Sequence, residues 1–375
     1  MTVTPAATAR TARQRSRSDR AGGEDRSADL DQALSWIAGN ADELDRRPRF
    51  PDEAFRRLGA AGVLAASSRG GGDSPFVDEL RLVRDVSRAD GSVGRILDGH
   101  LNAVERLLLS APVALDAAER RAITTGRRLL GVWGADPERG EGEPASLREE
   151  PGGIRLHGVK AFCSGAGGVQ RALVVARDAA GARRLAYVDL ASGVSIDRDW
   201  YRADGLRASE SHRVVFRGAR VLALLGGDGE ISREPWFSRD ALRTSATWAG
   251  IADGIVEAAT SWLGQHGADG QLPGLAAGRM RVAAATVDRW IEHAGREADA
   301  GRPLSDTSIE ARWAIASACR EIVADAAIAC GSRPLATGGA LSRGRRDLDL
   351  FLLQHRLEPK LAAHGTAAIN GMDGR

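Results

Sequence analysis

The chain has 375 residues, of which 43% are hydrophobic, enough to bury a core in two or three structural units. Its 52 basic and 50 acidic residues leave a formal net charge of +2, which gives no general reason to expect nucleic acid or an anionic membrane as a partner. The three cysteines have neither the spacing of a disulfide framework nor that of a metal-binding CxxC pair. We therefore predict a cytoplasmic protein without a metal site.

The N-terminal third divides into a tail and a helical block. Residues 1–28 are rich in Arg, Ser, Thr, Ala and Gly. So few large apolar side chains cannot offset the entropy of ordering, and this composition predicts a disordered tail. Apolar residues then recur at helical spacing, as in Leu30, Leu34 and Ile37, which predicts an N-terminal α-helical domain over residues 29–127.

The middle of the chain has a different pattern. Short β-branched runs such as "ALVVAR", "LAYVDL" and "HRVVFR" alternate with glycine and aspartate, which predicts a β-domain over residues 128–228. Beyond it, alanine-rich amphipathic stretches predict a helical domain over residues 229–375, with helices near 239–265, 276–299, 307–330 and 345–364. The order is therefore α, β, α.

Three segments in the β-domain resemble motifs of one family. They are "GVWGADP" from Gly131, "IRLHGVKAFCSGAG" from Ile154 and "GLRASESHRVVF" from Gly205. With the α, β, α order, they are similar to the strand-and-loop, hairpin and strand-pair motifs of the acyl-CoA dehydrogenase superfamily. The resemblance implies an α+β fold, mostly α: an N-terminal helical domain, a middle β-barrel-like domain and a C-terminal four-helix bundle.

The resemblance also implies a flavin cofactor, FAD or alternatively FMN, between the last two domains. The cofactor-binding residues it implies near the flavin ring are Trp133, Gly134, Ala135, Phe162, Cys163 and Ser164. A hydroxyl directed at the flavin could tune how the cofactor accepts hydride. Two of these residues have simpler interpretations: Trp133 as a strand residue in the core, and Cys163 as a small buried hydrophobe.

Other positions follow from the same resemblance. Ser209 and Ser211 lie where the family shapes the substrate mouth, although serines there can equally satisfy turn hydrogen bonds. Gly331 and Arg333 replace a glycine-rich loop that in relatives approaches the adenine end of FAD in a neighbouring subunit. A helix C-cap before Pro334 explains the glycine equally well.

The position of the family's catalytic glutamate holds His355 in this chain. Two interpretations of the chemistry follow. In one branch of the dehydrogenases the base lies on the first helix after the β-domain, where this chain has Asp240. In the flavin-monooxygenase branch a histidine follows at similar spacing, which favours His355, with His100 facing the flavin pocket, as an acid–base group.

The sequence thus predicts a flavin-dependent oxidoreductase resembling acyl-CoA dehydrogenases, which introduce a double bond into an acyl thioester. One alternative is a flavin-dependent monooxygenase of the same fold acting on a small molecule, and another is a non-catalytic scaffold. The resemblance implies a homodimer or homotetramer. It also implies a flavin reductase or an electron-transfer flavoprotein as a redox partner.

Overall fold

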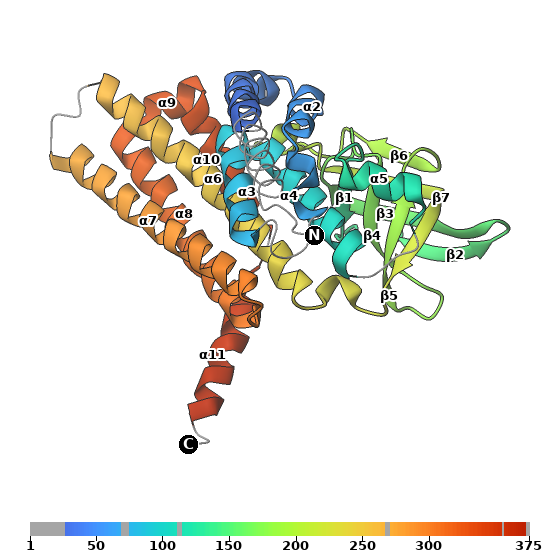
Figure 1. The fold of residues 1–375 in the computed structure, drawn as a ribbon. Coiled ribbons are helices and arrows are strands. Elements are labelled where there is room, and N and C mark those ends of the chain that lie inside the picture. The colour runs from blue at the N-terminus through green and yellow to red at the C-terminus, as the bar shows by residue number, and fades with distance from the viewer. Residues whose placement is uncertain (1–26, 69–74, 111–114, 267–270, 355, 373–375) are drawn as a thin grey trace, which may run out of the picture.

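The computed structural model describes residues 27–68, 75–110, 115–266, 271–354 and 356–372. The helical and β parts lie side by side, with the β-domain on one flank and the long C-terminal helices on the other (Figure 1). Most of the predicted N-terminal tail, residues 1–26, lies outside the described residues, and residues 27 and 28 already belong to a helix that extends to residue 46.

The N-terminal domain consists of helices. Aspartate side chains cap two of them: Asp90 accepts a hydrogen bond from the Val93 amide at 2.9 Å, and Asp116 accepts one from the Glu119 amide at 2.7 Å. After the helix over 27–46, the elements are α2 (Asp52–Ala60), η1 (Val63–Ser68), α3 (Phe76–Ala89), α4 (Gly91–Glu105), η2 (Arg106–Ser110) and α5 (Ala117–Thr124).

The β-domain is a closed sheet. Its strands are β1 (Leu130–Trp133), β2 (Ser146–Glu150), β3 (Gly153–Cys163), β4 (Arg171–Arg177), β5 (Arg183–Asp189), β6 (Val194–Asp197) and β7 (His212–Leu225). The order β1-β4-β2-β3-β7-β5 is closed by a further pairing of β4 with β5, while β6 pairs with β7. The closed ring consists of β4, β2, β3, β7 and β5, while β1 and β6 each pair with one strand of it. The predicted β-barrel-like domain is confirmed.

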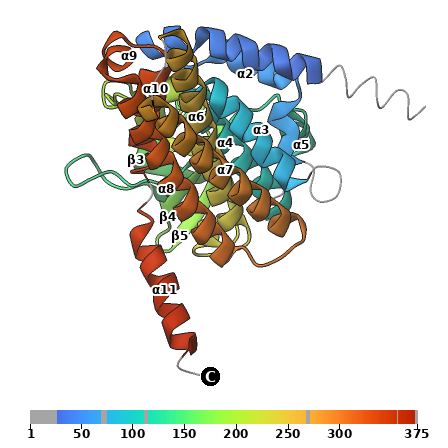
Figure 2. The ribbon, with the colours of Figure 1, turned by 90° about the vertical axis from the view of Figure 1, so that its left-hand side faces the viewer.

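Long helices form the C-terminal domain: α6 (Trp236–Gln265), α7 (Gln271–Asp299), α8 (Ser305–Cys330), α9 (Ser332–Thr337), α10 (Ala340–Phe351) and α11 (Glu358–Met372). Helices α7 and α8 run alongside α6 (Figure 2). Helix α6 also packs closely on α3. A Cβ on Gly250 would lie 2.1 Å from the backbone oxygen of Arg84, so only glycine fits at this contact.

One predicted helix is wrong in detail. The stretch 345–364 is divided between α10 and α11, and α11 extends away from the bundle (Figure 1). Pro359 explains where the second helix begins, because proline lacks an amide hydrogen and is tolerated in the first helical turn but not in the interior. None of the described helices combines the length and apolar character needed to cross a membrane.

Candidate functional site

Phe162 lies near the end of β3, where its ladder with β7 is irregular. The register shifts between Lys160 and Cys163, and Phe162 has a left-handed backbone with φ of 50°. Its neighbours Ala161 and Cys163 are buried, whereas Phe162 is 49% exposed. A bulge re-aims the side chain that it carries, and this one turns the phenyl ring out of the barrel core into a cavity.

This central cavity has a volume of about 580 Å³ and lies between the β-domain and the C-terminal helices. Its β-domain side consists of Gly134, Ala135, Phe162, Ser164, Tyr201, Leu206 and Ser211. Its helical side consists of Arg95, Leu350, Phe351, Leu353, Gln354 and Arg356. Among these described lining residues there are two arginines and no carboxylate.

Three serine hydroxyls form a chain behind the β-domain wall. The Ser164 and Ser211 oxygens are 2.9 Å apart, and Ser211 is 2.7 Å from Ser209. Ser209 is completely buried and lines no part of the cavity. The indole nitrogen of Trp133 donates to the Ser164 carbonyl at 3.0 Å, which fixes the backbone that carries the Ser164 hydroxyl. The hydroxyls of Ser164 and Ser211 therefore face the cavity from a rigid support.

A buried lysine holds the loop that carries Gly134 and Ala135. The ammonium of Lys160 donates to the Gly134 carbonyl at 3.1 Å and to the Asp136 carboxylate at 2.6 Å. The Ala161 amide donates to the Ala135 carbonyl at 3.1 Å. Burial lowers the pKa of Lys160, although Asp136 favours its charged form. These contacts fix the strand end against β3, where both small residues face the cavity.

The loop before β7 connects the two walls of the cavity. The Leu206 amide donates to the Asp347 carboxylate on α10 at 2.6 Å. A Cβ on Gly205 would lie 2.1 Å from the Arg346 carbonyl, so this approach requires glycine. Leu206 itself has φ of 50°. Strained backbone at Leu206 and Phe162, both on the cavity wall, is typical of positions held for function.

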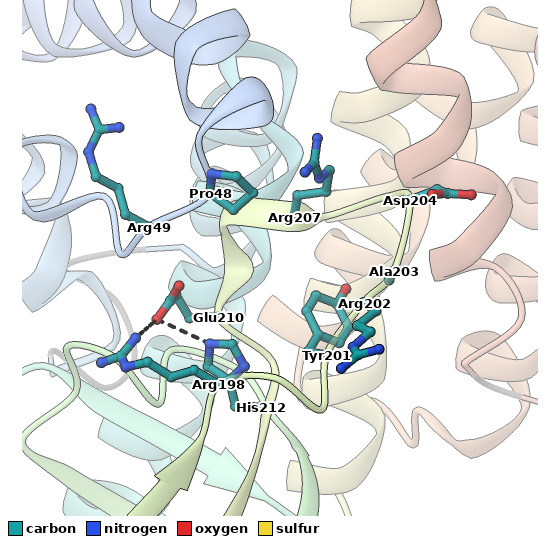
Figure 3. A pocket seen from close by; sticks show the side chains of 10 residues that line it. All are labelled: Pro48, Arg49, Arg198, Tyr201, Arg202, Ala203, Asp204, Arg207, Glu210 and His212. Atoms are coloured by element: carbon teal, nitrogen blue, oxygen red, sulfur yellow. Dashed lines mark hydrogen bonds and ion pairs between the residues drawn. The ribbon is translucent and has the colours of Figure 1, made fainter.

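A second, polar cavity of about 650 Å³ adjoins the first, since Tyr201 lines both. Figure 3 shows Glu210 between Arg198 and His212 on one side of it. The Glu210 carboxylate is 2.5 Å from the Arg198 guanidinium and 3.2 Å from the His212 ring nitrogen. This second cavity is also lined by arginines, which place positive charge beside the central cavity: Arg49, Arg198, Arg202 and Arg207.

Asp240, predicted as the catalytic base, is bound to an arginine. Its carboxylate lies 2.6 Å from the Arg106 guanidinium and 3.6 Å from that of Arg243. Burial raises the pKa of Asp240 to about 7, although both arginines favour the charged form. The side chain lines a third cavity between helices, but not the central one. An ion-paired carboxylate outside the central cavity is a poor base for a substrate held there.

The predicted histidines have different outcomes. His100 is completely buried, and its ring nitrogens lie 2.9 Å from the Leu64 carbonyl and 3.1 Å from the Leu130 amide. Both nitrogens are thus used by the backbone, and burial lowers the pKa of His100 to about 4. The geometry makes it a structural link between η1 and β1 rather than a catalytic group. His355 lies outside the described residues.

The predicted cofactor residues fall into three groups. Gly134, Ala135, Phe162 and Ser164 lie together on the central cavity, as does the predicted substrate residue Ser211. Trp133 and Cys163 are buried behind this wall and do not line it. For Cys163 the reason is the bulge, which points Phe162 outward and Cys163 inward. Gly331 lies between α8 and α9 and Arg333 lies in the first turn of α9; both are exposed and line none of the three cavities. Their predicted contact with a cofactor of a neighbouring subunit stays a prediction.

Sequence reasoning missed several residues of the site. Arg95 comes from the middle of α4, and its guanidinium lies 5.4 Å from the centre of the Phe351 ring, which also lines the cavity. Tyr201 lies in the loop between β6 and β7, and its hydroxyl donates to the Gly205 carbonyl at 3.1 Å. Arg95 has no distinctive local signal, because Asp98 and His100 follow it on the same helix.

The central cavity suits the ring system of a flavin. The exposed ring of Phe162 offers an aromatic face, and the Ser164 hydroxyl offers a hydrogen bond. A Cβ at Gly134 would have only Val175 within 4 Å, at 3.9 Å, so the backbone is open on its cavity side. An aromatic face, a hydroxyl and an approachable backbone are what a planar, polar-edged cofactor requires.

Sequence comparison finds dehydrogenase and reductase relatives, while no family model matches the chain. The chain is 32% identical over 154 residues to acyl-[acyl-carrier-protein] dehydrogenase MbtN of Mycolicibacterium paratuberculosis, a match covering 39% of this chain and 38% of that protein. It is 23% identical over 291 residues to acryloyl-CoA reductase (NADH) of Anaerotignum propionicum, covering 72% of this chain and 74% of the relative. The first match thus spans about two fifths of that relative's length.

Comparison of structures extends over nearly the whole chain. TdsC from Paenibacillus sp. A11-2, whose structure with FMN is known, superposes with a TM-score of 0.78 at 19% identity, covering 92% of this chain and 98% of TdsC. TdsC is described as a dibenzothiophene monooxygenase. The predicted resemblance to the acyl-CoA dehydrogenase superfamily, including its flavin-monooxygenase branch, is confirmed at the level of fold. The predicted flavin-dependent oxidoreductase agrees with the names of these proteins.

Proposed function

We propose that this chain is a flavin-dependent oxidoreductase that binds the flavin ring, of FMN or FAD, in the central cavity. The observation that carries the proposal is the joint placement of Gly134, Ala135, Phe162 and Ser164 on one wall of that cavity. These residues come from two separate motifs, and the fold brings them to the same surface. A bound flavin would supply hydride acceptance or, once reduced, the activation of oxygen.

The residues of the chain would position the cofactor and exclude water. Phe162 would cover one face of the ring, and Ser164 would donate to its edge through a hydroxyl backed by Ser211. On the helical side, Leu350 and Phe351 would keep the reacting region apolar. Such shielding strengthens every electrostatic interaction inside the cavity.

We favour the monooxygenase reaction over acyl dehydrogenation. Dehydrogenation needs a base to remove the α-proton, and no carboxylate occurs among the described residues of the central cavity. Asp240, the alternative base, is engaged by Arg106 and lies outside this cavity. TdsC, which is described as a monooxygenase, resembles this protein over 92% of the 375-residue chain.

Acyl dehydrogenation is the second candidate because the chain is 32% identical over 154 residues to a protein named as an acyl-[acyl-carrier-protein] dehydrogenase. Reduction without oxygen, followed by mixing with oxygenated buffer, separates the two functions. We expect rapid reoxidation of the reduced flavin, which a monooxygenase requires. Reduced flavin that persists in air would instead favour the dehydrogenase.

The first prediction concerns flavin binding. Phe162→Ala and Ser164→Ala should each weaken flavin affinity by about tenfold, the cost of one stacking contact or one hydrogen bond. The measurement is a fluorescence titration with FMN and with FAD. Arg148→Ala, at an exposed site on β2, is the control and should bind like the wild type. Wild-type protein that takes up neither flavin would contradict the proposal and support the non-catalytic scaffold.

The second prediction concerns His355, which replaces the family's glutamate. If His355 transfers the proton, His355→Ala should slow turnover by about 100- to 10,000-fold, as expected for the loss of an acid–base group. Flavin binding and stability should remain. His293→Ala, at an exposed histidine on α7, is the matched control. Equal turnover in the two variants would remove His355 from the mechanism.

We also propose a homodimer or homotetramer that receives electrons from a flavin reductase or an electron-transfer flavoprotein. Large apolar side chains are exposed on three C-terminal helices, including Leu272, Val282, Ile328 and Ile369. Burial of this surface in a second copy would remove apolar area from water. Light scattering that finds a monodisperse monomer at micromolar concentration would contradict the oligomer.

A further inference from the structure

A third cavity, the helical cavity, lies among α4, α6, α8 and the start of α11. It has a volume of about 170 Å³ and is lined by Asp240 and Thr244 of α6, Arg312 of α8 and Lys360 of α11. Arg95 lines both this cavity and the central one. A molecule held in the helical cavity would therefore lie next to the proposed flavin site.

Most charges around the helical cavity are paired. Asp98 accepts from Arg95 at 3.0 Å, and Asp240 pairs with Arg106 at 2.6 Å. Behind them, Glu105 pairs with Arg243 at 2.9 Å. Each of these carboxylates is thus matched by a guanidinium group.

Arg312 is the exception. Its side chain is 3% exposed, yet the described part of the chain contains no hydrogen-bond or ion-pair partner for it. The guanidinium carbon lies 5.8 Å from the centre of the Trp248 ring. Burial lowers the pKa of Arg312 to about 10, although the charge of Asp98 opposes this. A guanidinium taken out of water without a carboxylate is costly unless a ligand compensates it.

Lys360 adds a second cation at the same cavity. Its ammonium lies 4.3 Å from the centre of the Phe237 ring. Burial lowers the pKa of Lys360, and so does the nearby charge of Arg312, while Glu234 has the opposite effect. Two cations that disfavour each other's charge would both be stabilised by one anion between them.

We propose that the helical cavity binds an anionic oxyacid group of the substrate, with Arg312 and Lys360 as its cationic contacts. The group is a carboxylate, a sulfonate or a phosphate monoester, all of which accept several charge-assisted hydrogen bonds. The remainder of the substrate would extend past Arg95 into the central cavity. This inference rests on the proposed function, because it names the class of substrate that the flavin would oxidise.

Calorimetric titration with benzoate, and with benzamide as the uncharged probe of equal shape, tests the proposal. Flavin-free wild-type protein should bind benzoate and not benzamide. Arg312→Gln should weaken benzoate binding by about tenfold or more, as expected for a lost charge-assisted bond. Arg320→Gln, an exposed arginine on the same helix, should bind like the wild type. Lys360→Gln should weaken binding to a smaller degree and serves also if Arg312→Gln fails to fold.

Equal binding of the two probes, or undiminished benzoate binding by both Arg312→Gln and Lys360→Gln, would overturn the proposal. Repeating the titration on FMN-loaded protein separates two sources of the anion. If the cavity serves the substrate, FMN should leave benzoate binding intact; if benzoate is excluded, the cavity holds the cofactor phosphate and the substrate assignment is wrong. Because the first titration needs no flavin, its outcome is independent of whether the proposed function fails.

Discussion

Arg243 and Arg312 are buried arginines on packed helices, and their surroundings differ. Arg243 on α6 donates to Glu79, to Glu105 at 2.9 Å and to Asn102 at 3.1 Å. Arg312 on α8 contacts the Trp248 ring and forms no hydrogen bond or ion pair among the described residues. Charge compensation, not burial alone, thus distinguishes a guanidinium that stabilises the fold from one available to a ligand.

The region around Arg243 holds three helices together. Glu79 comes from α3, Glu105 from α4 and Arg243 from α6. The neighbouring carboxylates raise the pKa of Arg243 despite its burial, so its charged form is the one the network stabilises. The helical cavity around Arg312 offers no comparable compensation within the described residues. The predictions below test this contrast, beginning with the largest expected effect.

Arg243→Gln should lower the free energy of unfolding by about 3–5 kcal/mol, because removing one partner leaves buried carboxylates uncompensated. Urea denaturation followed by circular dichroism measures the change. Arg320→Gln is the control and should change stability by about 0.5 kcal/mol or less, as surface substitutions do. A loss below about 1 kcal/mol in Arg243→Gln would show that water or rearrangement replaces the network.

Asp240 should make stability depend on pH near neutrality. Burial raises the pKa of this carboxyl to about 7, above its value in the unfolded chain. The folded state therefore binds the proton more tightly, and the free energy of unfolding should fall as pH rises from about 4 to about 7. The Asp240→Asn variant has no carboxyl to titrate at this position. Its free energy of unfolding should therefore fall by about 1–3 kcal/mol less than that of the wild type over this pH range.

The wild type, measured over the same pH range, is the control. It is needed because burial also raises the pKa of Asp347 to about 7, so part of the pH dependence does not come from Asp240. Both proteins should retain the part of the decline that Asp347 contributes. Unfolding midpoints measured in urea at several pH values give the slopes. Identical slopes would mean that Arg106 keeps Asp240 ionised throughout, as its 2.6 Å contact would favour.

Arg312→Gln should change the free energy of unfolding by about 1 kcal/mol or less in either direction, the smallest effect expected among the substitutions at buried positions. The substitution removes an uncompensated buried charge and leaves no partner behind, while the cation–π contact with Trp248 is lost. The same urea experiment measures it beside Arg243→Gln. A loss as large as that of Arg243→Gln would place Arg312 among the structural arginines and remove the contrast.

The two walls of the central cavity differ in how far sequence reasoning could predict them. Gly134, Ala135, Phe162, Ser164 and Ser211 belong to short motifs, and the structure brings all of them to one surface. The helical wall combines a local segment, which includes Phe351 and Arg356, with Arg95 of α4, and no sequence pattern joins Arg95 to that segment. Motif residues are close in sequence or on paired strands, so their proximity follows from local geometry.

The sequence by itself determined the α, β, α order and the strand-forming runs of the β-domain, which follow from hydrophobic periodicity and turn composition acting over a few residues. The resemblance to the acyl-CoA dehydrogenase superfamily, and not periodicity, implied five residues of the β-domain wall: Gly134, Ala135, Phe162, Ser164 and Ser211. Only the tertiary structure decided that the bulge near Cys163 turns Phe162 outward, that Arg106 pairs with Asp240 and that Arg312 has no described partner. Arg106 and Asp240 are 134 positions apart, and such pairings depend on how whole helices pack.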